Sequence, residues 1–128
     1  MNLARILLGI NAVFFIGYGI LNLIWPAAMA AQVDLWLTPE SSLIELRAAF
    51  GGAMLGVGVF FAWTLTQPGH TVAGLIAMIA IIGGFAVGRA AGMLTETPVA
   101  SIHGWLLGIE VVLVAAGVVA LRRVAAPR

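Results

Sequence analysis

Four long apolar stretches dominate the pattern of hydrophobic and polar positions along this chain. They cover residues 6–25, 43–65, 71–94 and 102–121. Each approaches or exceeds the roughly 20 residues with which an α-helix crosses a bilayer core about 30 Å thick. We therefore predict an all-α integral membrane protein, a bundle of four transmembrane helices that forms a single domain over residues 1–128.

Prolines mark the ends of these stretches. Pro26 follows the first stretch and ends it. Thr38-Pro39 precedes the second stretch and Thr97-Pro98 precedes the fourth. A threonine N-cap followed by proline at the first helical position is typical of a helix start, so both pairs are predicted to open helices.

The connecting segments differ in length. Residues 66–70 and 95–100 are predicted to be tight turns, whereas residues 27–42 form a longer connection that contains apolar side chains. Trp25 lies just before this connection and Trp36 lies within it. Because tryptophan is enriched at the depth of the lipid headgroups, we expect the segment to lie in the membrane interface.

Composition supports a lipid environment. Of 128 residues, 62% are hydrophobic and only 9% are charged, whereas a soluble domain has about 25% charged residues. A chain this short would leave much of its surface in water if it were soluble. The net charge of +1 gives no indication of nucleic-acid binding. The absence of cysteine excludes disulfides and thiolate metal sites.

The first stretch has some features of a secretory signal sequence. Arg5 precedes it, and Ala28-Met29-Ala30 follows it like a small-residue cleavage site. However, its apolar run is longer than the roughly 7–15 residues usual in signal sequences. We expect it to be retained as the first transmembrane helix.

Arginines predict the orientation. Arg5 precedes the first stretch, and Arg122, Arg123 and Arg128 follow the last, while the three connections contain neither lysine nor arginine. Cytoplasmic segments of membrane proteins are enriched in these residues. Both termini are therefore predicted to be cytoplasmic, and the first and third connections to face outward.

Four charged residues lie inside the apolar stretches: Glu45, Arg47, Arg89 and Glu110. A charge at the centre of a bilayer costs about 2.5–3.5 kcal/mol on insertion scales. The two acids and two bases can neutralise one another. We predict that Arg89 and Glu110 share one polar network in the bundle interior. Since Glu45 and Arg47 are two residues apart and point to different helix faces, each is expected to have its partner on another helix.

With this orientation, polar residues gather in the outer half of the membrane. Helical spacing also gives them common faces. The faces are Asn11, Tyr18 and Asn22 in the first stretch and His103, Glu110 and Gly117 in the last. The predicted ligand-binding set is Tyr18, Asn22, Glu45, Arg47, Arg89, His103 and Glu110.

Small residues recur at four-residue intervals in the second and third stretches. Such small-xxx-small ridges allow transmembrane helices to pack closely, so we expect them to form the helix–helix contacts. The ridges are Ala48, Gly52 and Gly56, and Gly84, Gly88 and Gly92.

Two interpretations of the polar set stay open. In one, the charges are ion pairs that only hold the helices together. In the other, they line an outward-opening pocket in which the arginines bind an anionic or carbonyl group, as the planar guanidinium does well. The glutamates would accept hydrogen bonds, and Tyr18 and Asn22 would add others. Lipid headgroups, quinones and acyl compounds all have suitable chemistry.

His103 stands at the entrance of the last stretch. We interpret it as an interfacial hydrogen-bonding residue, with ligation of a haem or pigment as the alternative. The predicted helices contain no second histidine, which excludes a haem held by two histidines of one protomer. We therefore expect no cofactor and no metal.

Two sequence segments carry a family resemblance. Residues 45–52 (ELRAAFGG) and 88–92 (GRAAG), together with the isolated Glu110, resemble a family of small bacterial four-span membrane proteins catalogued as a domain of unknown function. That family is similar in size and topology to DoxX-like proteins. The resemblance covers nearly the whole chain, Pro26 included. It implies a four-helix membrane bundle and brings no activity. We expect a multi-pass protein of the bacterial cytoplasmic (inner) membrane.

Our functional hypothesis is a non-enzymatic membrane protein. It would be an accessory subunit of a larger membrane complex or homo-oligomer, or it would bind a small lipid-like or quinone-like amphiphile. A transporter that uses Glu110 and Arg89 is the alternative, but the inner half of the helices offers few polar side chains for a path. A membrane enzyme with Glu110 in acid–base catalysis is the third option. We assign no catalytic residue, because no nucleophile or metal cluster accompanies Glu110.

Overall fold

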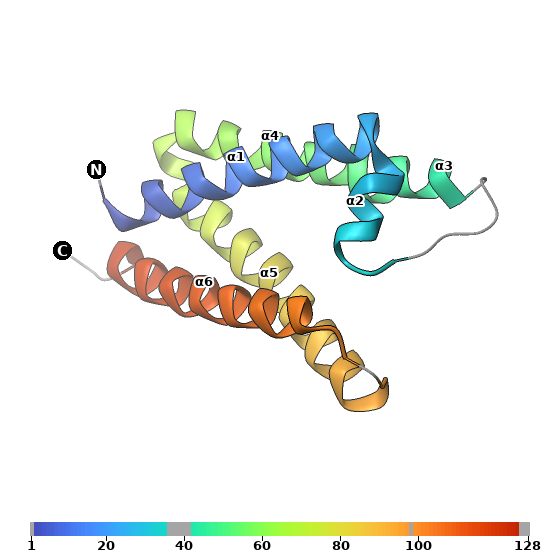
Figure 1. The fold of residues 1–128 in the computed structure, drawn as a ribbon. Coiled ribbons are helices and arrows are strands. Elements are labelled where there is room, and N and C mark those ends of the chain that lie inside the picture. Colours follow the sequence, from blue (N-terminus) through green and yellow to red (C-terminus); the bar gives the residue numbers. More distant parts are fainter. Residues whose placement is uncertain (1, 36–41, 98, 126–128) are drawn as a thin grey trace. The chain divides into compact units, whose positions relative to one another are not determined.

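The computed structural model describes residues 2–35, 42–97 and 99–125, and within these ranges the chain is helical with no strand (Figure 1). Three consecutive elements, α3, the π-helix η1 and α4, join into one continuous helix. The elements in chain order are α1 (Leu3–Ile24), α2 (Pro26–Gln32), α3 (Ser42–Leu46), η1 (Arg47–Ala53), α4 (Met54–Thr66), the 3₁₀ turn η2 (Pro68–His70), α5 (Thr71–Thr95) and α6 (Ser101–Ala125).

Four helices are long and apolar enough to cross a membrane, which confirms the four predicted spans. They are Leu3–Ile24, Ser42–Thr66, Thr71–Thr95 and Ser101–Ala125. Length and apolar composition are the two properties that a spanning helix needs. The described part of the chain is therefore that of an all-α, multi-pass membrane protein.

Helix starts are less well predicted than the helices themselves. α6 begins at Ser101, where the N–H of His103 donates to the carbonyl of Ala100. Thr97 lies well before this start, so its predicted role as the N-cap is wrong. Trp25, a predicted interface residue, lies directly before α2 and is 58% exposed. The remaining predicted start and interface residues lie outside the described residues. They are Trp36, Thr38, Pro39 and Pro98.

The long first connection contains a helix that the sequence analysis did not predict. α2 starts with Pro26, and Met29 and Ala30 are buried. It ends in a Schellman motif, in which the N–H of Leu35 donates to the carbonyl of Ala30. Asp34 occupies the left-handed position of this motif at φ 60°, where glycine is usual.

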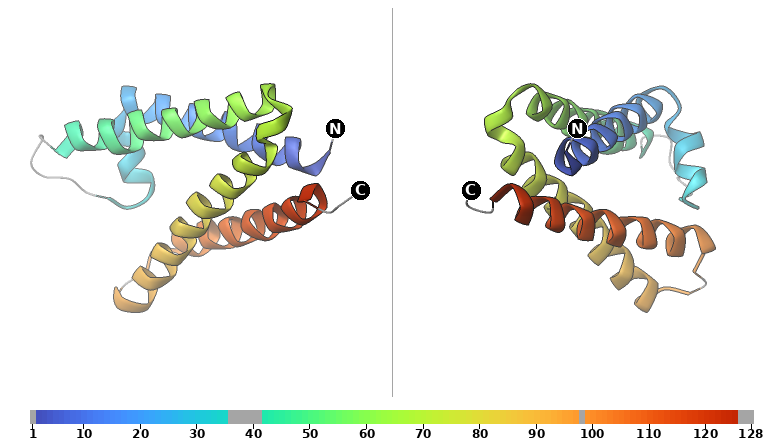
Figure 2. Two further views of the ribbon diagram at one scale, coloured as in Figure 1. Left: turned by 180° about the vertical axis from the view of Figure 1, so that it is seen from behind. Right: turned by 90° about the vertical axis from the view of Figure 1, so that its left-hand side faces the viewer.

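The contacts within the chain group into two compact units, residues 1–8 with 64–128, and residues 9–63. In the first unit, α5 and α6 run in opposite directions and pack against each other where they cross at an angle (Figure 2). Leu75 and Met78 of α5 are fully buried. Gly117 permits the close approach of α6, because a Cβ there would lie 2.6 Å from Cε of Met78.

In the second unit, α1 packs against η1 and α4. The rings of Phe15 and Phe61 are 5.8 Å apart and both side chains are buried. A Cβ on Gly19 would lie 2.6 Å from the backbone nitrogen of Leu55, and a Cβ on Gly58 would lie 2.6 Å from that of Ile16. Glycine therefore lets these two backbones touch.

Among the described residues, the glycines of the predicted ridges do not form the helix–helix contacts within either unit. Positions Gly56, Gly84, Gly88 and Gly92 have nothing within 4 Å of an added Cβ, and Gly52 meets only its own helix. Close approach occurs instead at other glycines. They are Gly19, Gly51, Gly58, Gly74 and Gly117. A four-residue spacing defines a helix face, but it does not determine whether that face meets a neighbouring helix.

Candidate functional site

The centre of the candidate site is an ion pair between the two spanning helices of the first unit. Nε of Arg89, on α5, lies 3.1 Å from each carboxylate oxygen of Glu110, on α6. Nη2 of Arg89 lies 2.8 Å from Oε1 of the same carboxylate. Glu110 is 8% exposed. This two-point geometry is the strong form of the arginine–carboxylate interaction, and it confirms the predicted connection of the two residues.

His103 extends the pair to a cluster of three. Its Nδ1 lies 3.1 Å from Nη1 of Arg89. Arginine has no acceptor atom, so Nδ1 must accept this hydrogen bond. In this geometry His103 is therefore a neutral imidazole with its proton on Nε2. His103 and Glu110 share the helix face of Gly117, which the seven-residue spacing predicts, and Gly117 packs on α5.

The cluster is electrically neutral but still rich in hydrogen-bond donors. Guanidinium carries five N–H groups, and the contacts to Glu110 and His103 use one each on Nε, Nη1 and Nη2. One N–H remains on each Nη, and His103 adds its Nε2–H. The side chain of Arg89 is 21% exposed and that of Glu110 is 11% exposed. An uncharged acceptor, such as a carbonyl oxygen, is the chemical group that these donors suit best.

Arg47 takes part in a different interaction in the second unit. Its Nε donates to the backbone carbonyl of Leu23 at 3.1 Å. The last carbonyls of a helix need donors from elsewhere, and Arg47 supplies one at the end of α1. The expected partner on another helix is present, although it is a carbonyl and not an acid. Arg47 is otherwise exposed.

Glu45 departs from the expectation. It is exposed at the start of the second spanning helix, and it makes no hydrogen bond or ion pair with any residue that the structure describes. The predicted partner on another helix is therefore absent among the described residues.

Tyr18 and Asn22 lie beside the end of α1 that Arg47 contacts. Asn22 is 2% exposed, and its amide nitrogen donates to the carbonyl of Tyr18 at 2.9 Å. The ring of Tyr18 stacks on Phe14 with centroids 5.7 Å apart. Asn22 thus bonds to its own helix. The ligand-binding roles of Tyr18, Asn22 and Arg47 stay predictions, as does that of Glu45.

The π-helical segment η1 is a feature that the sequence analysis missed. It begins at Arg47 and covers seven residues, Arg47–Ala53. π-helical turns often occur at functional sites, because they displace the side chains that follow from their regular positions. The paired glycines Gly51 and Gly52 within it are the only local signal, and they are too common in membrane helices to have identified it.

No group of three or more histidine or acidic side chains in the described ranges is placed to hold a metal ion.

Comparison with known proteins finds no match among curated proteins and none among solved structures. A family model does match, over residues 3–121, which is nearly the whole chain. The resemblance to a four-span family without an assigned function is thereby confirmed. The chain belongs to the family described as Domain of unknown function (DUF4345).

Proposed function

We propose that this protein is a non-enzymatic, multi-pass protein of the bacterial cytoplasmic membrane that binds a small amphiphile at the cluster of Arg89, Glu110 and His103. The ligand has a polar head with a carbonyl acceptor, as in a quinone or an acyl compound. The protein would perform this role as an accessory subunit of a larger membrane complex or as a homo-oligomer. The observation that supports the proposal is the set of unused donors on a neutral, partly exposed cluster.

The charge balance distinguishes between ligand classes. Glu110 already neutralises Arg89 through a two-point contact, so an anionic head gains little net attraction and must compete with the carboxylate. A neutral carbonyl oxygen needs only the free N–H groups. The lipid around these apolar spanning helices then accommodates the hydrophobic tail. A quinone-like head therefore fits better than a phosphate.

The same geometry argues against acid–base catalysis at Glu110. A general acid or base must be within hydrogen-bond reach of the substrate proton. Both oxygens of this carboxylate are engaged by Arg89. A substrate would have to compete with the guanidinium for this carboxylate.

Binding is tested with a short-tailed benzoquinone titrated into the purified protein in detergent, followed by isothermal calorimetry. We expect saturable binding that weakens at least tenfold in His103→Ala, because this variant removes the Nε2–H donor. His70→Ala is the matched control, since His70 is the other histidine and is exposed in η2; its affinity should equal that of the wild type. A long-chain alkyl phosphate should not displace the bound quinone, because Glu110 already neutralises Arg89. Equal affinities of His103→Ala and the wild type would contradict the proposal.

Orientation is a separate prediction. We expect both termini in the cytoplasm, because Arg5 lies in the first turn of α1 and Arg122 and Arg123 lie in the last turn of α6, and all three are exposed. A green fluorescent protein fused after the C-terminus should fluoresce, and an alkaline phosphatase fused there should be inactive. An active phosphatase at that position would reverse the orientation and assign the Arg89 cluster to the inner half of the membrane.

A further inference from the structure

A hollow lies in the first unit, far along α6 from the Arg89 cluster. It has a volume of about 280 Å³ and is open to the outside, between the first turn of α1 and the last turn of α6. This is slightly below the roughly 300–1,000 Å³ of typical ligand pockets, so it can hold a headgroup but not a whole lipid. The residues that line it are Asn2, Leu3, Ala4, Ala120, Arg123 and Val124.

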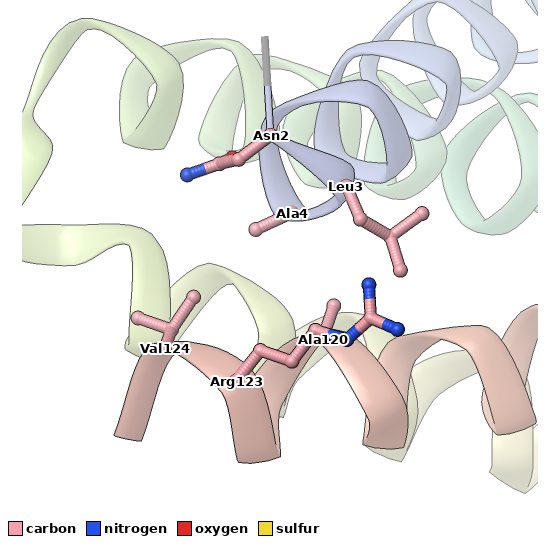
Figure 3. Close-up of a pocket in the computed structure, with 6 residues that line it drawn as sticks. All are labelled: Asn2, Leu3, Ala4, Ala120, Arg123 and Val124. Atoms are coloured by element: carbon pink, nitrogen blue, oxygen red, sulfur yellow. The ribbon is translucent and has the colours of Figure 1, made fainter. Parts of the chain in front are cut away.

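Most of the lining is apolar. Ala4 and Ala120 are each 1% exposed and form its inner wall, while Val124 is 39% exposed at its edge. The guanidinium of Arg123 extends from α6 into the space below α1 (Figure 3). The hollow thus combines an apolar wall with a single cationic side chain. It lies at the ends of α1 and α6, which are both long enough to cross a membrane.

Among the described residues, the charged side chains around the hollow are all positive. Arg123 makes no hydrogen bond or ion pair with any described residue, and no acidic residue lines the hollow. Arg5 and Arg122 are exposed in the same turns of α1 and α6. The start of α1 adds the positive end of its helix dipole, and the negative end of α6 is offset by its two arginines. The local field therefore attracts an anion.

Asn2 caps the first turn of α1 beside the hollow. Its side-chain oxygen accepts a hydrogen bond from the backbone N–H of Arg5 at 3.1 Å, as an N-cap does. The carbonyl of Asn2 accepts the N–H of Ile6. The N–H groups of Leu3 and Ala4, in the same first turn, have no acceptor within the helix itself, and both residues line the hollow.

We propose that this hollow binds the phosphate of an anionic phospholipid, with Arg123 and the first turn of α1 as donors and the acyl chains along the apolar wall. The guanidinium matches phosphate in two-point geometry. Basic pockets between membrane helices are suited to anionic headgroups at the cytoplasmic surface, which is where the arginines place this end. The site is independent of the ligand proposed for Arg89.

The test uses the purified full chain in lipid-free detergent and native mass spectrometry. Phosphatidylglycerol and phosphatidylcholine with identical acyl chains are titrated in parallel. We expect a one-lipid adduct with phosphatidylglycerol at least fivefold tighter than with phosphatidylcholine. Arg123→Gln should weaken phosphatidylglycerol binding at least fivefold. Arg122→Gln, the matched control with the same loss of charge outside the hollow, should weaken it clearly less than Arg123→Gln does, because Arg122 contributes only to the surrounding field.

Two further experiments test whether the lipid occupies the hollow and whether its acyl chains are needed for binding. Val124→Phe keeps every charge and fills the hollow from its exposed edge, so it should also lose the adduct. Inorganic phosphate at millimolar concentration should not displace the lipid, because the acyl chains contribute to binding. Equal losses in Arg122→Gln and Arg123→Gln, an unaffected Val124→Phe, or full displacement by inorganic phosphate would each overturn the proposal.

Discussion

Arg89→Ala and Glu110→Ala are each expected to lower the stability of the protein in detergent by about 3–5 kcal/mol, since each leaves an unpaired charge in the interior. Glu110 is 8% exposed, and it contacts Arg89 through both carboxylate oxygens. The loss is large because the remaining charged group stays shielded from water and no longer has its partner. Thermal unfolding followed by circular dichroism measures the effect.

The double variant Arg89→Ala with Glu110→Ala distinguishes a coupled pair from two independent contributions. Once one partner is gone, removal of the other eliminates the unpaired charge, so the double variant should be clearly less destabilised than the sum of the singles. Arg122→Ala is the control, because Arg122 is exposed at the end of α6, the helix that carries Glu110. The stability of this variant should be close to that of the wild type. Additive losses in the double variant would show that the two side chains do not act as a pair.

The four spanning helices were predictable because a bilayer imposes a simple rule. Backbone polar groups must be satisfied within the segment, so every span is a long apolar helix. The ion pair was predictable for a related reason, since a lone charge in hydrocarbon is too costly to persist. Arg89 needed an acid at a matching depth, and Glu110 is the acid in the neighbouring helix.

The contacts between helices were not predictable in the same way. In lipid, every face of a helix is apolar, so periodicity does not distinguish a packed face from an exposed one. Gly84 and Gly88 form a regular ridge yet meet nothing, while Gly19 and Gly58, which belong to no predicted ridge, carry the contact of α1 with α4. The partner of Arg47 escaped prediction because it is a backbone carbonyl, which no charge pattern reveals.

Two glycines on α1 give a direct test of that contact. A Cβ on Gly19 would lie 2.6 Å from the backbone nitrogen of Leu55 and 2.9 Å from the carbonyl oxygen of Gly51, whereas a Cβ on Gly17 would have nothing within 4 Å. Backbone atoms cannot rotate aside, so α1 would have to move away from its partner helix. We expect Gly19→Ala to destabilise the protein by roughly 1–3 kcal/mol, as overpacking does.

Gly17→Ala is the matched control for the Gly19 prediction. Alanine favours a helix over glycine by about 1 kcal/mol, so this variant should be as stable as the wild type or more stable. The same chemical change two residues apart should thus have opposite signs in a thermal unfolding assay. Equal effects of the two variants would show that α1 does not meet α4 at Gly19.

Gly58→Ala examines the same contact from the opposite helix. Its Cβ would lie 2.6 Å from the backbone nitrogen of Ile16, so it also forces α1 and α4 apart. Either substitution alone moves the two backbones away from each other, and the second then meets a contact that is already widened. We therefore expect the double variant Gly19→Ala with Gly58→Ala to lose less stability than the sum of the two single variants. A sum that is fully additive would mean that the two glycines lie in separate contacts.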